Sequence, residues 1–233
     1  MALISIEEVC EGVRLGLWCM DEEPEQLLEH FPHLRRQECP YKHSARRKEF
    51  FSVRALLLAM TGEPELRIEH AESGRPVVQG WQVSISHTKD YAALILSKEG
   101  VAELDEQDSP QGVSSVGVDI EYRSDRVAKI ASHYIRQDEM VADYKSPTAD
   151  CSALTTEQML VLWCAKETLY KLHSDDNLGY FEMRATAPPC GNELMLENMK
   201  RGRQVKIHVI STPEYVLTWA VDFERLKPIV RTA

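Results

Sequence analysis

One order of secondary structure is predicted twice along this chain, and this repeat constrains the fold more than any other feature. A long helix with apolar side chains at helical spacing is followed by two alternating strands around a short turn. The predicted elements span 44–62, 81–87 and 91–97 in the first half, and 156–173, 205–211 and 215–223 in the second. Aligning the halves pairs Phe51 with Trp163 and Tyr91 with Tyr215. We therefore expect an α+β fold of two similar halves related by pseudo-twofold symmetry.

Local signals predict where several of these elements begin and end. Ser44 and Gly62 are expected to bound the first long helix, and Thr156 to cap the second. A shorter helix is predicted over 21–31 with Asp21 as its cap. The other expected elements are a strand or short helix in 5–20, an acidic linker over 98–115, a strand over 116–122 and an amphipathic helix over 125–135.

The length of 233 residues fits one large domain or two halves of similar size. We place the boundary between an N-terminal half, 1–112, and a C-terminal half, 113–233. No stretch approaches the roughly 18 apolar residues of a membrane span, and the acidic start does not resemble a signal peptide. The six cysteines form no CxxC pair. Free thiols in a reducing cytoplasm are therefore expected.

The net charge of −10 argues against general affinity for nucleic acid or anionic membranes. The segment from Arg35 to Arg54 is the exception, with seven Lys or Arg against two Glu. This basic segment is either a local anion site or a solvated helix face, and charge alone does not decide between them.

Asp119 and Glu121 stand in the apolar strand "VGVDIEY". Residues two apart on a strand share a face, so both carboxylates point the same way. Such a pair suits a hard divalent ion, because Mg²⁺ takes one or two carboxylates together with phosphate oxygens. Ordinary acids on an exposed edge strand are the alternative.

The second long helix carries "WCAKETLYK", in which Glu167 and Lys171 share a face. A surface ion pair is the simple interpretation. If the helix packs beside the acidic strand, three carboxylates and two lysines, Lys166 and Lys171, come together. Such a set can hold Mg²⁺ and phosphate oxygens, as phosphoryl transfer requires.

Four motifs in this order resemble those of the 4′-phosphopantetheinyl transferase superfamily. They are "GRPVV", "SISHT", "VGVDIE" and, about 45 residues later, "WCAKETLYK". The resemblance runs from about Arg46 to the C-terminus. Length and duplication resemble the monomeric, pseudo-dimeric type that activates surfactin synthetase.

The resemblance implies a fold, a reaction and a set of residues. The enzyme would move the 4′-phosphopantetheine arm of coenzyme A to a serine of an apo acyl or peptidyl carrier protein and release 3′,5′-ADP. Asp119, Glu121 and Glu167 would bind Mg²⁺, and Glu167 and Lys171 would be catalytic. The coenzyme A contacts implied are Arg46, Arg47, Gly74, Arg75, Pro76, Ser86, His87, Lys166 and Lys171.

The resemblance also implies a cytoplasmic monomer that serves lipid or secondary-metabolite biosynthesis. The N-terminal half would bind the nucleotide, and the C-terminal half would bring metal and acceptor. One departure lies after Lys171, where Asp175 and Asp176 replace the Gly-Lys-Gly-like loop of the family. A non-catalytic coenzyme A or nucleotide-binding protein and an unrelated Mg²⁺-dependent hydrolase are the alternatives.

Overall fold

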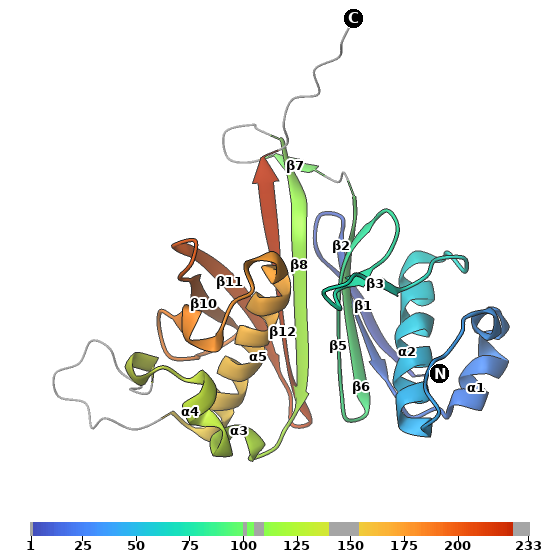
Figure 1. The fold of residues 1–233 in the computed structure, drawn as a ribbon, viewed down its shortest axis with the longest axis horizontal. Helices are drawn as coiled ribbons and strands as arrows, with labels where there is room; N and C mark the ends of the chain where they lie inside the picture. The colour runs from blue at the N-terminus through green and yellow to red at the C-terminus, as the bar shows by residue number, and fades with distance from the viewer. Residues whose placement is uncertain (1, 100–101, 105–109, 140–153, 226–233) are drawn as a thin grey trace, which may run out of the picture.

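The computed structural model describes residues 2–99, 102–104, 110–139 and 154–225. It has a mixed α and β architecture, with two main antiparallel sheets and few helices. The sheets stand side by side at the centre of the molecule, and helices cover their outward faces (Figure 1). The predicted mixed α and β class is confirmed, whereas the pseudo-twofold relation between the halves stays a prediction.

The first sheet has four strands in the order β1-β2-β6-β5. Its strands are β1 (Leu3–Cys10), β2 (Val13–Cys19), β5 (Trp81–Thr88) and β6 (Tyr91–Lys98). The predicted strands at 81–87 and 91–97 are confirmed, and Asp90 takes a left-handed conformation in the tight turn between them. For residues 5–20 the sequence predicted either a strand or a short helix. The structure has the β1–β2 hairpin there.

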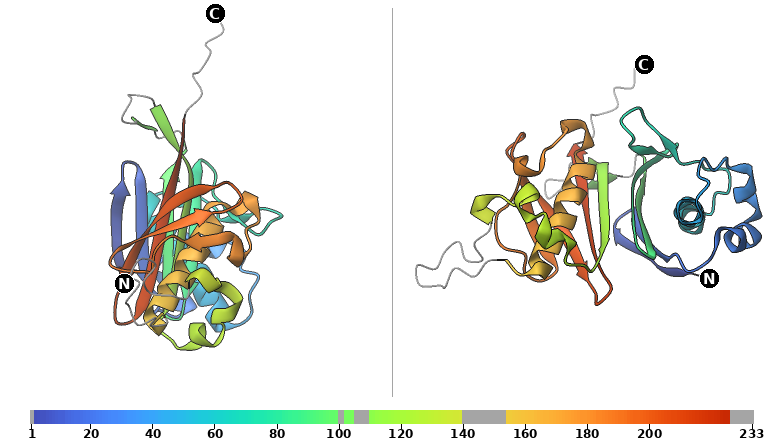
Figure 2. Two further views of the ribbon diagram at one scale, coloured as in Figure 1. Left: turned by 90° about the vertical axis from the view of Figure 1, so that its left-hand side faces the viewer. Right: turned by 60° about the horizontal axis from the view of Figure 1, so that its bottom comes forward.

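Two helices, α1 (Pro24–His30) and α2 (Ser44–Thr61), cover this sheet. Figure 2 shows α2 end-on inside the curve of the strands. Gly62 ends α2 in the left-handed conformation, as predicted. The predicted caps were wrong: His43 precedes α2, and Glu23 rather than Asp21 caps α1 through a reciprocal pair with Gln26.

The second sheet has six strands in the order β7-β8-β12-β11-β10-β9. Its strands are β7 (Ala102–Leu104), β8 (Pro110–Tyr122), β9 (Met183–Ala185), β10 (Glu193–Asn198), β11 (Arg203–Ser211) and β12 (Tyr215–Arg225). A separate two-stranded sheet pairs β3 (Glu69–His70) with β4 (Pro76–Val77). The linker prediction was partly wrong, because 102–104 and 110–115 are in strands, while 100–101 and 105–109 lie outside the described residues.

The long helix α5 (Thr156–Leu172) packs on β8 and β12. Its cap is Thr155 rather than Thr156, and Thr155 exchanges hydrogen bonds with Gln158. Gly117 permits the close approach of β8, because a Cβ atom there would lie 2.6 Å from the carbonyl oxygen of Thr168. The sequence therefore brings the acidic strand directly under the helix that carries Glu167.

The predicted amphipathic helix over 125–135 is broken into two short ones. These are α3 (Arg126–Lys129) and α4 (Ala131–Tyr134), with a 3-10 turn, Gln137–Glu139, after them. Further 3-10 turns span Pro32–Arg36, Ser174–Asp176 and Tyr180–Glu182.

The two sheets meet through hydroxyl groups at their edges. Ser84 and Thr88 of β5 accept hydrogen bonds from the backbone amides of Val118 and Tyr122 of β8, both at 3.1 Å. Beside this seam, apolar side chains of β2, β6, β8 and β12 form a shared core, and the rings of Tyr91 and Tyr215 lie 4.8 Å apart. The seam therefore places β5 against the acidic strand.

Two further expectations concern membranes and thiols. Across the described part of the chain, no helix has the length and apolar character needed to span a bilayer. As predicted, the described cysteines form no disulfide with one another; they are Cys10, Cys19, Cys39, Cys164 and Cys190, and Cys151 lies outside the described residues.

Candidate active site

Asp119 lies buried where β5, β8 and α5 meet. Its Oδ1 accepts hydrogen bonds from Lys171 at 2.7 Å and from Ser86 at 2.8 Å. Its Oδ2 is buried and has no hydrogen-bond partner among the described residues. Because an unpaired buried carboxylate oxygen is costly, this atom is a natural position for a cation or a further donor.

Glu121 follows on the same face of β8, as the two-residue spacing predicts. Its Oε1 accepts a hydrogen bond of 2.9 Å from the indole Nε1 of Trp163, on α5. Burial raises the pKa of this carboxyl, and the negative charge of Asp119 raises it further. The two carboxylates therefore influence each other electrostatically.

Glu167 faces the same region from α5. Its Oε1 accepts a 2.5 Å hydrogen bond from the hydroxyl of Tyr180. Burial is the main cause that raises the pKa of Glu167, and Asp119 adds to it, while Tyr180 and Lys171 act in the opposite direction. The charge of Asp119 thus raises the pKa of both glutamates.

The oxygens of the three carboxylates are of the type that a hard cation binds. A cation would relieve the repulsion between the carboxylates, and Oδ2 of Asp119 has no partner among the described residues. As they stand, however, the described acids, histidines and cysteines form no group of three that could share an ion. Trp163 and Tyr180 each hold one of the glutamates through a hydrogen bond.

The two lysines of the helix motif have different environments. Lys171 reaches Asp119 and the carbonyl of Val118, and its side chain keeps 26% of its surface exposed. Lys166 is fully buried and donates to Glu139 and to the carbonyls of Tyr134 and Tyr180, at 2.7, 2.8 and 3.2 Å. Its ammonium is occupied by these oxygens, so we leave Lys166 out of the phosphate contacts proposed below.

A pocket of about 410 Å³ opens next to Asp119, between the two halves. Of the residues that sequence reasoning assigned to coenzyme A, six line it: Arg46, Gly74, Arg75, Pro76, His87 and Lys171. Cationic side chains face Glu49 and an apolar wall that includes Phe50, Val53 and Ile85. The pocket therefore suits a ligand with phosphate groups and an aromatic base.

The pocket residues are held by different elements. Arg46 pairs with Glu49 on α2 at 2.8 Å, and the imidazole of His87 lies 3.8 Å from the same carboxylate. Burial lowers the pKa of His87, and the nearby charges of Arg46 and Lys171 lower it too. Arg75 follows the left-handed turn at Gly74 and donates to Gln82 at 3.3 Å.

Two other predicted contacts lie elsewhere. Ser86 points to Asp119 rather than into the pocket, so it supports the acidic strand. Arg47 forms an ion pair of 2.9 Å with Glu25 on α1, and Lys48 pairs with Glu23 there. Part of the basic segment therefore joins α2 to the start of α1, which neither of the two interpretations anticipated, and we do not carry Arg47 into the proposal.

Sequence reasoning missed or misjudged three residues of this region. Arg54, predicted only as part of the basic segment, lines the pocket, stacks on Phe50 and donates to Gln37 and to the carbonyl of Ile68. Trp163, for which no role in the site was predicted, holds Glu121 through its indole nitrogen. Tyr180 carried no signal, because it follows the helix motif in a short turn of irregular sequence.

Comparison with known proteins bears on the half that carries the acids. No curated protein matched the chain. Residues 115–220 match the family model of the 4′-phosphopantetheinyl transferase superfamily, and this segment contains Asp119, Glu121, Glu167 and Lys171. The chain is thus similar over this segment to that superfamily, which supports a transferase activity of the phosphopantetheinyl class.

Proposed function

We propose that this protein transfers the 4′-phosphopantetheine arm of coenzyme A to a serine of an apo acyl or peptidyl carrier protein, with Mg²⁺, and releases 3′,5′-ADP. One observation carries the proposal. Lys171 belongs to the cationic pocket and also contacts Asp119, whose Oδ2 accepts no hydrogen bond within the described part of the chain. A phosphate held by the pocket would therefore lie next to a carboxylate cluster suited to metal.

The pocket would bind the nucleotide part of coenzyme A. Arg46, Arg75 and His87 would contact phosphate oxygens, and Gly74 and Pro76 would border the adenine. Arg54 is buried and cationic beside them, although burial lowers its pKa to about 10. At neutral pH it remains charged, so it adds to the positive potential of the pocket.

The carboxylates would hold Mg²⁺ through Asp119, Glu121 and Glu167. When bound, the ion would neutralise charge on the pyrophosphate of coenzyme A and favour attack at phosphorus. Lys171, which reaches Asp119 from the pocket side, would hold the phosphate that leaves with 3′,5′-ADP.

The transfer itself exchanges one phosphorus–oxygen bond for another. The serine oxygen forms a bond to the phosphorus that carries pantetheine, and the bond from this phosphorus to the oxygen of 3′,5′-ADP breaks. The serine proton would pass to Glu167, and burial raises the pKa of this carboxyl above the usual value of a glutamate, which makes it a better proton acceptor. Positioning both substrates between the halves would supply much of the rate.

The pseudo-dimeric, surfactin-synthetase-activating type remains part of this proposal. In each half a long helix packs on an antiparallel sheet, and Tyr91 and Tyr215, which the internal alignment pairs, touch across the seam. With halves of 1–112 and 113–233, one chain would carry a whole site between them. A monomer in the cytoplasm, serving lipid or secondary-metabolite synthesis, follows from the same proposal.

An acidic carrier protein would bind through exposed cationic side chains. In 123–136, Val127 and Ile135 are buried, and Arg123 and Arg136 pair with Glu157 and Asp138. Arg126 and Lys129 on α3 remain exposed, and we propose them as contacts for an acidic carrier protein.

The test is incubation with coenzyme A, Mg²⁺ and a panel of apo carrier proteins, followed by mass spectrometry. A carrier that gains one phosphopantetheine group on serine supports the proposal. Coenzyme A binding without turnover would favour the non-catalytic binding protein. Breakdown of coenzyme A without a modified carrier would favour a hydrolase.

A further inference from the structure

Tyr170 is an aromatic side chain that the C-terminal half contributes to the pocket. It lies on α5 directly before Lys171 and is 40% exposed. Within the described part of the chain, its ring contacts no other aromatic ring and its hydroxyl makes no hydrogen bond. A single exposed aromatic is ordinary on a protein surface, but this one lines a cavity. Tyr170 therefore offers a free aromatic ring to a ligand in the pocket.

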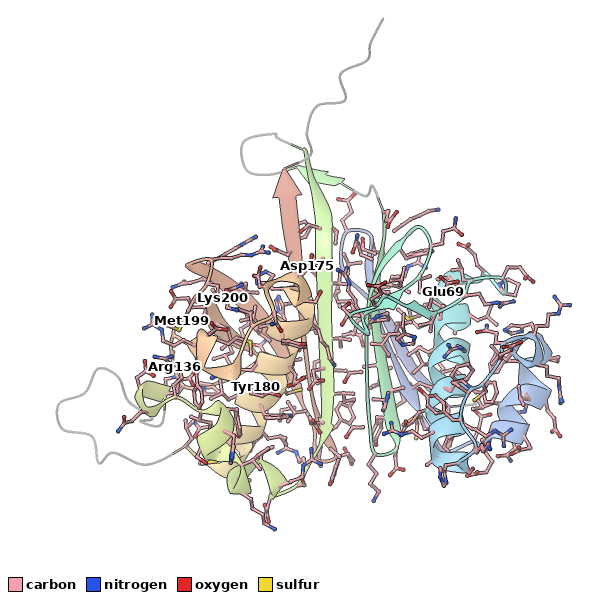
Figure 3. All side chains as sticks on the ribbon, in the orientation of Figure 1. Glu69, Arg136, Asp175, Tyr180, Met199 and Lys200 are labelled. Carbon is pink, nitrogen blue, oxygen red and sulfur yellow. The ribbon has the colours of Figure 1, made fainter. Side chains whose placement is uncertain are left out.

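The turn between β3 and β4, which carries Arg75, faces the end of the same helix. Arg75 lies 3.9 Å from the carboxylate of Asp175, which follows α5 in the 3-10 turn Ser174–Asp176 (Figure 3). Ser174, about one helical turn after Tyr170, also lines the pocket. This end of the pocket is therefore bounded by the N-terminal half on one side and by the end of α5 on the other.

A second exposed tyrosine, Tyr41, lines the pocket from the N-terminal half. Its ring packs edge-on against Phe50, with centroids 6.2 Å apart, and the guanidinium of Arg54 covers Phe50 at 3.3 Å. Tyr41 and Phe50 thus have partners in the protein, whereas the ring of Tyr170 has none among the described residues. A planar ligand ring would gain most from the side chain without a partner, because a surface already in contact offers little new area.

We propose that Tyr170 stacks on the adenine ring and makes the pocket selective for a nucleotide over phosphate alone. The inference rests on the proposed function, in which the pocket holds the nucleotide part of coenzyme A and the turn of Gly74 and Pro76 borders the adenine. Consecutive residues of a helix point about 100° apart. Tyr170 and Lys171 would therefore hold different parts of one ligand, the base and a phosphate.

The variant Tyr170→Ala removes the ring from an exposed helix position, where alanine is the best helix former. We expect it to raise the Kd for 3′,5′-ADP about tenfold, as for the loss of one stacked base. Tyr170→Phe should bind within about twofold of the wild type, because stacking uses the ring and not the hydroxyl. Phe181→Ala is the matched control, because Phe181 is a 50% exposed aromatic of the same half that does not line this pocket.

The experiment is calorimetric titration of 3′,5′-ADP into the full-length protein, for the wild type, Tyr170→Ala, Tyr170→Phe, Tyr41→Ala and Phe181→Ala. Competition by inorganic pyrophosphate, which has no base, reports on the phosphate contacts alone. A loss of nucleotide affinity in Tyr170→Ala but not in Tyr170→Phe or Phe181→Ala, with pyrophosphate competition kept, supports the inference. Wild-type nucleotide affinity in Tyr170→Ala, an equal loss for both probes, or a loss in Tyr41→Ala in its place overturns it.

Carrier modification, measured separately, distinguishes this inference from the proposed function. If the wild type modifies a carrier while Tyr170→Ala binds 3′,5′-ADP as the wild type does, the inference fails and the proposed function stands. If Tyr170→Ala loses nucleotide affinity while the wild type modifies no carrier, the nucleotide contact stands and the proposed transfer fails. No binding of 3′,5′-ADP by the wild type contradicts both.

Discussion

Replacing Lys166 with methionine is expected to destabilise the protein strongly, because Lys166 and Glu139 form a buried ion pair. Their side chains are 0% and 1% exposed. The ammonium donates to three oxygens, and Glu139 also accepts from the backbone amides of Arg136 and Ala185 at 2.8 and 2.6 Å. Methionine preserves most of the volume while leaving the carboxylate without a counter-charge.

Removing one partner of such a pair costs about 3–5 kcal/mol, because a charge is left buried and uncompensated. This is a large part of the roughly 5–15 kcal/mol that stabilises a typical domain. The double variant Lys166→Met/Glu139→Gln removes both charges. We expect it to be less destabilised than the sum of the single variants by about 1–3 kcal/mol, as for residues in direct contact.

The assay is urea unfolding, comparing midpoints at constant slope. Lys206→Met is the matched control, because Lys206 forms an exposed pair with Glu193 at 3.4 Å, and its loss should change stability by only about 0.5 kcal/mol. A loss below about 1 kcal/mol in Lys166→Met, or strict additivity in the double variant, would refute the reasoning. If the folded variant instead lost affinity for coenzyme A alone, Lys166 would be a phosphate contact after all.

Three further predictions follow from the site. Gly117→Ala should destabilise the protein by about 1–3 kcal/mol and reduce transfer, because its Cβ would lie 2.6 Å from the Thr168 carbonyl oxygen. Gly179→Ala is the control in the same unfolding assay and should have little effect, because its Cβ would meet only Glu182 at 3.5 Å. Glu121→Gln or Glu167→Gln should raise the unfolding midpoint at pH 7 without metal. The raised pKa of each carboxyl means that its charged form is unfavourable in the folded protein. The gain in stability should vanish below about pH 4, where the wild-type carboxyls are protonated in both the folded and the unfolded state. An equal gain at pH 7 and below pH 4 would count against this explanation. Arg75→Gln should raise KM for coenzyme A several-fold, because Arg75 lines the pocket. Arg47→Gln should leave KM unchanged, since Arg47 pairs with Glu25. A rise in KM for Arg47→Gln but not for Arg75→Gln in steady-state kinetics would show that the phosphate contacts were assigned to the wrong arginine.

Local patterns in the sequence were enough to predict the main elements of the fold. The apolar runs in 81–97 and the helical spacing in 44–62 predict the type of each element, and the structure has strands and a helix there, although β6 is buried on both faces. The two-residue spacing of Asp119 and Glu121 likewise places both on the face toward α5. These features depend on neighbours in the chain, so they are readable from it.

Features that depend on distant partners were not predicted. The burial of Lys166 depends on Glu139, 27 residues away and next to a segment of broken helix. The part of β8 before Val116 was assigned to a linker, because its polar and small residues have no strand-like pattern of their own. These residues form a strand because they pair with β12. The seam of Ser84 and Thr88 depends on edge amides of β8, which no pattern within β5 reveals.

The central claim is that the acids around Asp119 and the cationic pocket act together in one transfer reaction. Mass spectrometry of an apo carrier protein after reaction with coenzyme A and Mg²⁺ tests it most directly, with the wild type and Asp119→Asn compared under the same conditions. Asp119→Asn keeps the size of the side chain and removes the charge that Lys171 contacts. We predict that the carrier gains one phosphopantetheine group with the wild type and none with the folded variant. Equal modification by both proteins, or none by the wild type across a broad carrier panel, would contradict the account.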